Sequence, residues 1–551
     1  MRSGGKILVG GLRGHGVDLA FCVPGESYLA VLDAMYDVRE QLKLIVCRQE
    51  GGASFMAEAY GKLTGRPGIC FVTRGPGATN ASIGVHTAYQ DSSPMILFIG
   101  QVGGDFVDRE AFQEVDYRRM FGQMSKWVAQ IDRADRIPEY LSHAFHLATS
   151  GRPGPVVLAL PEDMLVSEAD VTDAPRYKTA YSYPGLGQLE QLRELLSEAE
   201  RPFLLLGGSG WTADACSAMQ SFAESASLPV GCAFRCQDLF DNTHTNYAGD
   251  VGIGINPKLA QRIKESDLIV VVGSRLDEMT TSGYSLFDVP RPKQKFVHVH
   301  PSSDELGKVY QADLFINSSI PTLAGLLRAM PKIDGSRWKA NTQAAHADYL
   351  ANIEPGPCPG PVDFGSVMVW LRQRLPSNTI MTNGAGNFAQ WLARFYPFRP
   401  WRTQLAPING AMGYGLPSGI AAKLANPHRT VVTFCGDGDF LMTGQELATA
   451  MQYNVNVVFI VVNNGMYGTI RMHQEREYPA RDYGTALRNP DFAALARAYG
   501  AHGEKVETTE QFAPAFERAM AANKPALIEV MLDPEAITTR TTLTAIRNRR
   551  A

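Results

Sequence analysis

The sequence lacks any long uninterrupted apolar run. None of its apolar stretches reaches the roughly 18 residues that a membrane-spanning helix needs. Residues 1–16 also lack the apolar core and the small-residue cleavage site of a secretory signal. We therefore predict a cytoplasmic protein that has no membrane partner.

The sequence also lacks an excess of either charge. Its 52 Lys and Arg residues nearly balance 56 Asp and Glu residues, for a net charge of −4. This balance gives no indication of a nucleic-acid partner, so we predict none. Cysteine is scarce, and Cys232 and Cys236 are the only close pair. Because no further Cys or His pair lies near them, we interpret them as buried thiols rather than a zinc site or a disulfide framework.

What the sequence does contain is a repeated alternation of short apolar runs with segments of helix-like apolar spacing. Such alternation is typical of parallel sheets with helices on both faces. The predicted strands lie within residues 17–25, 43–50, 68–75, 94–100 and 151–164, then 201–210, 267–278 and 295–303, and finally 378–386, 430–440, 456–464 and 525–532.

Two linkers divide this alternation into three parts. One is the polar stretch that ends near residue 187, and the other is the Pro- and Gly-rich segment 353–361. We predict an α/β protein of three doubly wound parallel-sheet domains at residues 1–165, 188–335 and 360–551. Ligands are expected at the carboxyl ends of the strands.

Polar residues follow two of the predicted strands in the third domain. The first strand runs into Gly436-Asp437-Gly438-Asp439, and the second ends in Asn463-Asn464. The Asp437 carboxylate, the Asn464 amide oxygen and the carbonyl of Met466 are three hard oxygen donors that suit Mg²⁺ or Ca²⁺. The glycines allow the backbone to approach a phosphate closely. Either turn alone is commonplace, so the prediction of a site depends on the pair.

At this point the chain resembles the acetolactate synthase (acetohydroxyacid synthase) branch of the thiamine-diphosphate enzymes. The pair of turns matches the diphosphate-and-metal motif of that superfamily. The resemblance continues through segments 73–80, 87–94 and 111–114 of the first domain and 410–417 of the third, and the middle domain resembles that of the synthases, so it covers all three domains. It implies that the domains are, in order, pyrimidine-binding, middle and diphosphate-binding. It also implies thiamine diphosphate and Mg²⁺ as cofactors and a small 2-oxo compound as substrate.

The resemblance also assigns residues. Glu50 is implied to hydrogen-bond the aminopyrimidine and to help remove the proton from the reacting carbon, which Gln113 and Phe112 are implied to face. Met412 is implied to hold the cofactor bent, although a methionine in an apolar segment is ordinarily core filler. The expected cofactor contacts are Pro24, Glu50, Thr73, Gly386, Asn387, Phe388, Gly410, Met412, Gly436, Asp437, Gly438, Asp439, Asn464, Met466 and Tyr467, with Asp437, Asn464 and Met466 at the metal.

Two departures from the family pattern concern the substrate. The synthases carry an Arg that resembles a ligand for the second 2-ketoacid, where this chain has Met279. They also carry a Trp that shapes the acceptor pocket, and His473 stands there. Methionine cannot hold a carboxylate, so we predict a 2-oxo substrate other than that of branched-chain biosynthesis. Arg471 is interpreted either as a substrate anion ligand or as a surface helix residue, and His86 either as a proton donor or as a core histidine.

Several alternatives stay open at this stage. The middle domain resembles an FAD-binding domain, and FAD, an ADP-like ligand or no ligand are all compatible with its sequence. Arg540, Arg547, Arg549 and Arg550 form either a solvated tail or a clamp on an acidic substrate. The clamp favours a 2-hydroxyacyl-CoA lyase or an oxalyl-CoA-decarboxylase-like enzyme, and a non-catalytic cofactor-binding subunit is the third alternative. The resemblance implies a homodimer at minimum and favours a homotetramer, with each site shared between subunits.

Overall fold

The computed structural model describes residues 1–399 and 401–548. These residues form three six-stranded sheets, in each of which neighbouring strands run parallel, and one two-stranded antiparallel sheet. The predicted α/β class, with three parallel sheets covered by helices, is therefore confirmed.

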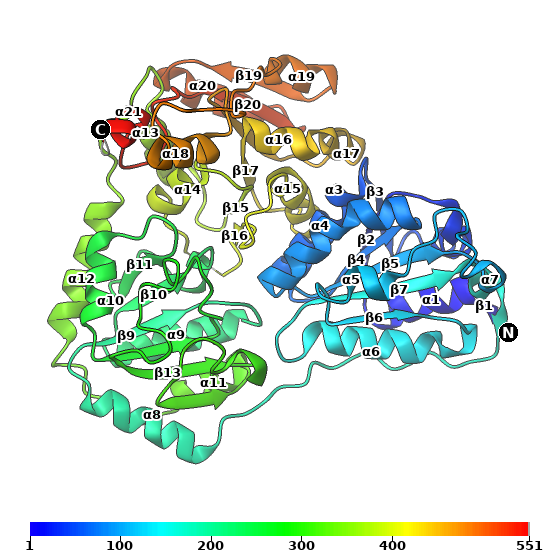
Figure 1. Cartoon of the computed structure of the whole chain (residues 1–551), viewed down its shortest axis with the longest axis horizontal. Helices are drawn as coiled ribbons and strands as arrows, with labels where there is room; N and C mark the ends of the chain where they lie inside the picture. Colours follow the sequence, from blue (N-terminus) through cyan, green and yellow to red (C-terminus); the bar gives the residue numbers. More distant parts are fainter. Residues whose placement is uncertain (400, 549–551) are drawn as a thin grey trace. The chain divides into compact units, whose positions relative to one another are not determined.

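The first sheet has the strand order β3-β2-β4-β5-β7-β6. Helices α1, α2 and α6 pack on one face over fully buried residues such as Ile69 and Phe71. Helices α3 and α4 lie on the other face (Figure 1). The strands are β2 (Leu19–Cys22), β3 (Lys43–Val46), β4 (Gly68–Val72), β5 (Met95–Gln101), β6 (Trp127–Gln130) and β7 (Pro155–Pro161), and β1 (Arg2–Ser3) pairs with β8 (Glu168–Ala169). The helices are α1 (Gly4–Gly14), α2 (Leu29–Tyr36), α3 (Glu50–Thr64), α4 (Gly75–Asp91), α5 (Tyr117–Phe121), α6 (Ile137–Thr149) and α7 (Glu162–Val166).

The second sheet has the order β11-β10-β9-β12-β13-β14. Its central strands β9 and β12 are continuous apolar runs, as expected for parallel strands that are buried on both faces. The strands are β9 (Pro202–Leu206), β10 (Val230–Ala233), β11 (Tyr247–Val251), β12 (Leu268–Val272), β13 (Lys295–His300) and β14 (Leu314–Asn317). The helices are α8 (Leu186–Glu198), α9 (Ala213–Ser225), α10 (Pro257–Glu265), α11 (Ile320–Arg328) and α12 (Lys339–Asn352).

The third sheet has the order β16-β15-β17-β18-β20-β19. Its core includes Phe434, Ile460 and Ile528 from three of its four inner strands. The strands are β15 (Ile380–Asn383), β16 (Gln404–Leu405), β17 (Val431–Gly436), β18 (Val458–Asn463), β19 (His502–Val506) and β20 (Ala526–Met531). The helices are α13 (Phe364–Arg374), α14 (Ala389–Phe395), α15 (Gly415–Ala425), α16 (Asp437–Thr443), α17 (Leu447–Gln452), α18 (Gly468–Glu477), α19 (Phe492–Ala498), α20 (Thr509–Ala521) and α21 (Leu543–Asn548).

By backbone contacts the chain divides into two compact units. The first contains residues 1–180 together with the later segments 407–427 and 441–456, and the second contains the rest of the described chain. The strands of each six-stranded sheet fall within one of the three predicted domain ranges. However, α15 and α17, which lie in the third range, belong to the first unit. The candidate site residues consequently fall into two groups, one in each unit.

Two predictions from the sequence concern membrane-spanning helices and the close cysteine pair. In the described part of the chain, no helix has both the length and the apolar character needed to cross a membrane. Cys232 and Cys236 are buried, free thiols, as we predicted. Burial raises the pKa of the Cys232 thiol well above its usual value, so it is kept protonated and unreactive.

Candidate functional site

In the first unit, Glu50 is the first residue of α3. The Gln49 side chain caps this helix by accepting a hydrogen bond from the Gly52 N–H at 3.0 Å. The half-buried Glu50 carboxylate accepts a hydrogen bond from Asn80 Nδ2 at 2.9 Å. One oxygen of Glu50 is thereby held in place, and a negative charge at the start of a helix is also favoured by the helix dipole.

Glu446, which sequence reasoning missed, fixes the chain just before Glu50. Its fully buried carboxylate accepts hydrogen bonds from the backbone N–H groups of Arg48 at 3.0 Å and Gln49 at 2.9 Å. Burial raises the pKa of Glu446, and these hydrogen bonds oppose the rise. A Cβ at Gly52 would lie 2.5 Å from the same carboxylate, so only glycine allows Glu446 to approach α3. No sequence motif marks this contact.

Pro24 and Thr73 follow the neighbouring parallel strands β2 and β4. The hydroxyl oxygens of Thr73 and Ser27 lie 3.0 Å apart. A Cβ at Gly25 would lie 2.5 Å from Thr73 Cβ, so the turn after Pro24 packs directly on Thr73. The two predicted contacts are therefore brought together at the carboxyl ends of two adjacent inner strands of the first sheet.

Gln113 combines a strained backbone with an unsatisfied side chain. Its φ is +65°, which is uncommon for a residue other than glycine. Its carbonyl accepts the Gly75 N–H at 3.0 Å, at the start of α4. Its Oε1 is buried and meets no hydrogen-bond donor among the described residues. Since buried acceptors are rarely left unsatisfied, this atom is suited to a bound ligand, and the neighbouring Phe112 is 72% exposed.

The segment that carries Gly410 and Met412 is anchored to Asp91. The Asp91 carboxylate accepts the backbone N–H groups of Ile408 at 2.9 Å and Asn409 at 3.1 Å. It also forms an ion pair with Lys62. Gly410 has a φ of +72°, a left-handed conformation that favours glycine, and Met412 is half-buried. Asp91 therefore orients this turn, which no local sequence signal predicted.

His86 is exposed, which excludes the interpretation of a core histidine. Its Nδ1 lies 3.2 Å from Asn409 Nδ2. That amide also donates to Thr87 Oγ1 at 3.0 Å. His86 is thus placed beside the turn that leads to Gly410.

In the second unit, Asp437 and Asn464 follow the paired strands β17 and β18. The Asp437 carboxylate is 3% exposed. Its Oδ1 accepts the Gly438 N–H at 2.9 Å, and its Oδ2 accepts the Gly465 N–H at 2.9 Å and Asn489 Nδ2 at 2.8 Å. Burial raises the pKa of Asp437, and these hydrogen bonds oppose the rise. Within the described residues neither Lys nor Arg forms an ion pair with it.

Asn464 and Met466 lie in the turn that follows β18. Asn464 Oδ1 accepts the Met466 N–H at 3.3 Å. Met466 pairs in antiparallel fashion with Ala486, and the Tyr467 N–H donates to the Thr485 carbonyl at 2.9 Å. The turn is therefore held by a second loop that returns along it.

The remaining predicted contacts shape the neighbouring turns. Asp439 is buried, and its Oδ1 accepts the Ala385 N–H at 3.1 Å. Asn387 Oδ1 accepts the Thr469 hydroxyl at 3.0 Å. A Cβ at Gly436 would lie 2.9 Å from the Phe388 ring, and one at Gly438 would lie 2.5 Å from the Tyr467 ring. Gly386 has a φ of +156°. Glycine at these positions leaves the aromatic rings packed against the backbone.

The donor set around Asp437 fits a divalent cation. The described residues contain no group of three His, Cys, Asp or Glu side chains arranged to hold a metal. A cation here would depend on one carboxylate and on amide and carbonyl oxygens, which are the ligands that Mg²⁺ accepts. A carboxylate that is removed from water is stabilised by a nearby positive charge. The described hydrogen-bond donors to Asp437 are neutral, and a bound cation would supply that charge. Asp437, Asn464 and the Met466 carbonyl are therefore suitable ligands for the Mg²⁺ ion that the sequence predicted.

Comparison with known proteins shows which family this chain belongs to. Models of the N-terminal TPP binding domain, the central domain and the C-terminal TPP binding domain of thiamine pyrophosphate enzymes match residues 2–120, 189–327 and 384–530. The probable acetolactate synthase large subunit of Methanocaldococcus jannaschii is 31% identical, over 96% of this chain and 92% of its own length. The chain belongs to the acetolactate synthase branch of the thiamine pyrophosphate enzymes.

Other members of this branch are similar over comparable lengths. The acetolactate synthase large subunit of Corynebacterium glutamicum is 32% identical, over 97% of this chain and 87% of its own. The acetolactate synthase isozyme 2 large subunit of Escherichia coli is 29% identical, over 96% of both chains. Membership in the branch makes the chain a thiamine-diphosphate-dependent enzyme of the ketoacid carboligase and decarboxylase type, so the alternative of a non-catalytic subunit is wrong.

The glycine-rich turn of the middle domain is explained by packing within this acetolactate-synthase-like enzyme. Gly208, after β9, and Gly273, after β12, have φ values of +71° and +80°. A Cβ at Gly208 would lie 2.0 Å from the Gly273 carbonyl oxygen. The Trp211 indole donates to the Gly207 carbonyl at 2.8 Å. These glycines let two turns touch, so their presence gives no support for a nucleotide.

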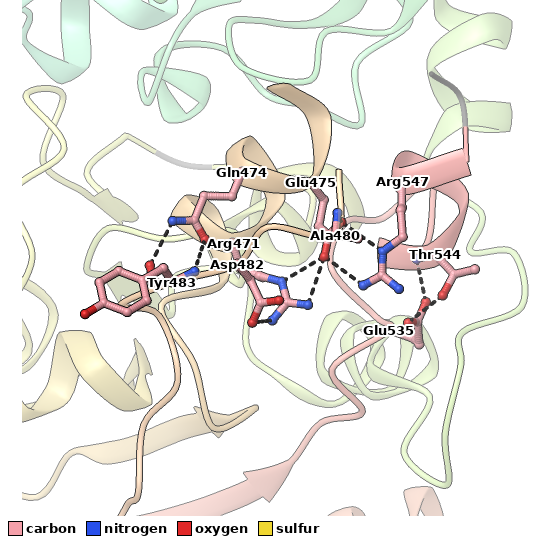
Figure 2. A network of polar contacts seen from close by, with 9 residues as sticks. All are labelled: Arg471, Gln474, Glu475, Ala480, Asp482, Tyr483, Glu535, Thr544 and Arg547. Atoms are coloured by element: carbon pink, nitrogen blue, oxygen red, sulfur yellow. Dashed lines mark hydrogen bonds and ion pairs between the residues drawn. The ribbon is translucent and has the colours of Figure 1, made fainter. Parts of the chain in front are cut away.

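Arg471 is held by carboxylates of its own chain (Figure 2). It forms ion pairs with Glu475 at 2.8 Å and Asp482 at 2.7 Å. Glu475 is fully buried, and it also binds Arg547 of the C-terminal helix α21 at 2.7 Å. The Arg547 hydrogen bond is the main cause that lowers the pKa of Glu475 to about 2. Arg471 is therefore a structural residue of α18 rather than an anion ligand.

The C-terminal arginines are likewise occupied where the structure describes them. Arg547 binds Glu475, and Arg540 Nη2 donates to Asn352 Oδ1 at 2.8 Å. Leu543 and Ile546 of α21 form a small apolar cluster with Ile537 and Met472. Helix α21 thus packs on α18 through Arg547 and this apolar cluster, while Arg549 and Arg550 lie outside the described residues.

We expect Glu475→Gln to lower the free energy of unfolding by roughly 1–3 kcal/mol at pH 7, because it weakens charge-assisted hydrogen bonds to two guanidinium groups. Since the folded pKa of Glu475 is depressed, its contribution is present above the unfolded pKa near 4.5 and is lost as the pH falls toward about 2. Urea unfolding of the parent and the variant between pH 7 and pH 3 measures this difference, which should shrink in acid.

Glu477→Gln is the matched control, because Glu477 lies on the same helix in an exposed ion pair with Arg476. Exposed pairs contribute little to stability. If the two variants unfold alike at every pH, Glu475 is not the anchor of this network.

Proposed function

We propose that the protein uses thiamine diphosphate and Mg²⁺ to break or form the C–C bond beside the carbonyl of a 2-ketoacid or related 2-oxo compound. The observation that carries this proposal is the buried Asp437 carboxylate. In the part of the chain that the structure describes, all its donors are neutral, and it lies beside Asn464 at the ends of paired strands. In an enzyme of this branch, that arrangement is best explained by a cation that binds a diphosphate.

Each group of residues has its own task in the proposed reaction. Asp437, Asn464 and the Met466 carbonyl would hold the cation. Glu50, fixed by Asn80 and Glu446, would hold a proton at the pyrimidine edge of the cofactor. When bound, thiamine diphosphate supplies the electron sink for the bond beside the carbonyl. The unsatisfied Gln113 Oε1 would accept a hydrogen bond from the reacting compound.

We further propose that the acceptor is not the second 2-ketoacid of branched-chain biosynthesis. The names of the relatives do not support this narrower assignment, which depends on Met279 and His473. Met279 is half-buried in the loop after β12, and that loop is held by Asp277, which accepts the Thr280 N–H at 3.0 Å. A thioether at this position offers no charge to a carboxylate.

The proposal includes neither FAD nor an acyl-CoA substrate. The middle-domain glycines are accounted for by packing, so FAD rests on the resemblance alone. The acyl-CoA alternative depended on a free basic tail, but Arg540 and Arg547 are both bound within the chain.

Turnover of a substrate panel tests the proposed substrate class. With added Mg²⁺ and thiamine diphosphate, we expect the protein to turn over at least one simple 2-oxo compound among pyruvate, benzoylformate and 1,2-diketones, with little product from two 2-ketoacids. Product analysis by mass spectrometry is the measurement. Efficient formation of acetolactate would contradict the narrower assignment, and turnover of acyl-CoA thioesters alone would contradict the substrate class.

Glu50→Gln should keep cofactor binding and lower kcat by about 10²- to 10⁴-fold, because an amide cannot exchange the proton that general acid–base catalysis needs. Calorimetric titration with thiamine diphosphate and steady-state kinetics measure the two effects separately. Glu198→Gln, an exposed change at the end of α8, serves as the control. Near-normal turnover in Glu50→Gln would disprove the assigned role.

We also propose that the Glu50 group and the Asp437 group of one site come from different subunits of a homodimer or a larger assembly. Glu50→Gln and Asp437→Ala should each be inactive as homo-oligomers. Co-expression should restore activity, because one site of a mixed dimer then receives both native residues. Activity assays on the co-purified, doubly tagged mixture provide the measurement. No recovery in a verified mixed oligomer would show that each site is built from a single chain.

A further inference from the structure

Asn489 contacts the Asp437 carboxylate, although no motif in the sequence marks it. Its Nδ2 donates to Asp437 Oδ2 at 2.8 Å and to Asn463 Oδ1 at 2.9 Å. Both hydrogens of this amide are therefore used. Asn489 is half-buried and stands two residues before the N-cap of α19, Asp491, so it belongs to the loop that returns along the Asn464 turn.

The orientation of the Asn463 amide is dictated by Glu529. Asn463 Nδ2 donates to Glu529 Oε1 at 2.8 Å, and its Oδ1 accepts the Gly465 N–H at 3.2 Å and the Asn489 amide. Glu529 is 2% exposed, and its other oxygen accepts the Phe492 N–H at 3.1 Å. An ionised carboxylate accepts at both oxygens. The opposite orientation of Asn463 would point an NH₂ group at two donors.

The acceptor count on Asp437 follows from these contacts. Among the described residues, Oδ2 accepts two N–H groups, from Gly465 and Asn489, whereas Oδ1 accepts the Gly438 N–H alone. A carboxylate has about four acceptor positions, so the remaining one lies on Oδ1. The donors thus saturate one oxygen and leave the other able to ligate a cation.

We propose that Glu529, Asn463 and Asn489 form a positioning relay that directs Asp437 Oδ1 toward the divalent cation. The proposal rests on the Mg²⁺ site of the proposed function and deepens it. Glu529 sets Asn463, Asn463 sets Asn489, and Asn489 saturates Asp437 Oδ2. None of the three relay residues is assigned a contact with the cation. The first Asn of the Asn463-Asn464 pair is consequently a positioning residue, and the second is the ligand.

Asn489→Ala tests the last link of the relay. Removal of an outer residue that orients a metal ligand typically weakens metal affinity about 10- to 100-fold. We expect the Mg²⁺ concentration at half-saturation to rise by that factor when the full-length, EDTA-treated protein is titrated with MgCl₂ at saturating thiamine diphosphate. Isothermal calorimetry measures the binding without any need for turnover.

Glu529→Gln tests the first link with an isosteric change. Gln offers one acceptor and one donor where two acceptors are required, so a donor must face either the Phe492 N–H or the Asn463 amide. We expect the Mg²⁺ half-saturation concentration to rise in this variant too. Asn246→Ala is the matched control, because Asn246 is a buried amide of the middle domain that donates to Ala223 and Leu228. It should lower the melting temperature of the apoprotein while Mg²⁺ affinity stays within about twofold of the parent, well below the change expected for a positioning residue.

The outcomes separate the relay from the proposed function. Asn489→Ala with parental Mg²⁺ affinity, or Asn246→Ala with an equal loss, would overturn the relay and leave the Mg²⁺ site of the parent intact. A parent protein that binds no Mg²⁺ with thiamine diphosphate would overturn both. Where Glu529→Gln fails to fold, Asn489→Ala alone decides, because it removes a half-buried loop side chain rather than a core carboxylate.

Discussion

Carboxylates buried away from water determine how the loops lie at the ends of the strands. A charge removed from water must be met by hydrogen-bond donors or by an opposite charge. Asp437, Glu446, Glu475 and Glu529 are each 3% exposed or less. In each case the donors come in part from segments distant in the sequence. Satisfying one carboxylate therefore fixes the positions of several loops at once.

These carboxylates differ in what neutralises them, and the difference separates structural from functional positions. Glu475 is bound by two guanidinium groups, and this local balance ties α18 to the C-terminal helix. The donors to Asp437 among residues 1–399 and 401–548 are all neutral, and they hold its orientation without opposing its charge. An arginine placed against Asp437 would satisfy that charge permanently and remove the reason for a cation to bind there. The same chemistry thus builds an anchor in one place and a binding site in another.

The sheets were predictable because central parallel strands are buried on both faces. Every predicted strand segment overlaps an observed strand, since runs such as β12 and β18 are continuously apolar. The strands that the sequence analysis missed are the short pair β1 and β8 and, in the six-stranded sheets, β6, β10, β11, β14, β16 and β19. All except β10 lie at a sheet edge, where one side of the strand is not covered and the apolar signal weakens. In β10, which has only four residues, Gly231 interrupts the apolar pattern.

The sequence by itself determined the family, the three parallel sheets and the positions of polar residues after strands. Asp437 and Asn464 directly follow β17 and β18, and Glu50 begins the helix after β3. These features are local, because an apolar run followed by a polar turn is read without knowing what packs against it. Only the tertiary structure decided which distant side chains fix those residues. Glu446 before Glu50 and Asn489 on Asp437 are brought there by chain segments far apart in sequence, and hydrogen bonds across such separations leave no periodic or compositional trace.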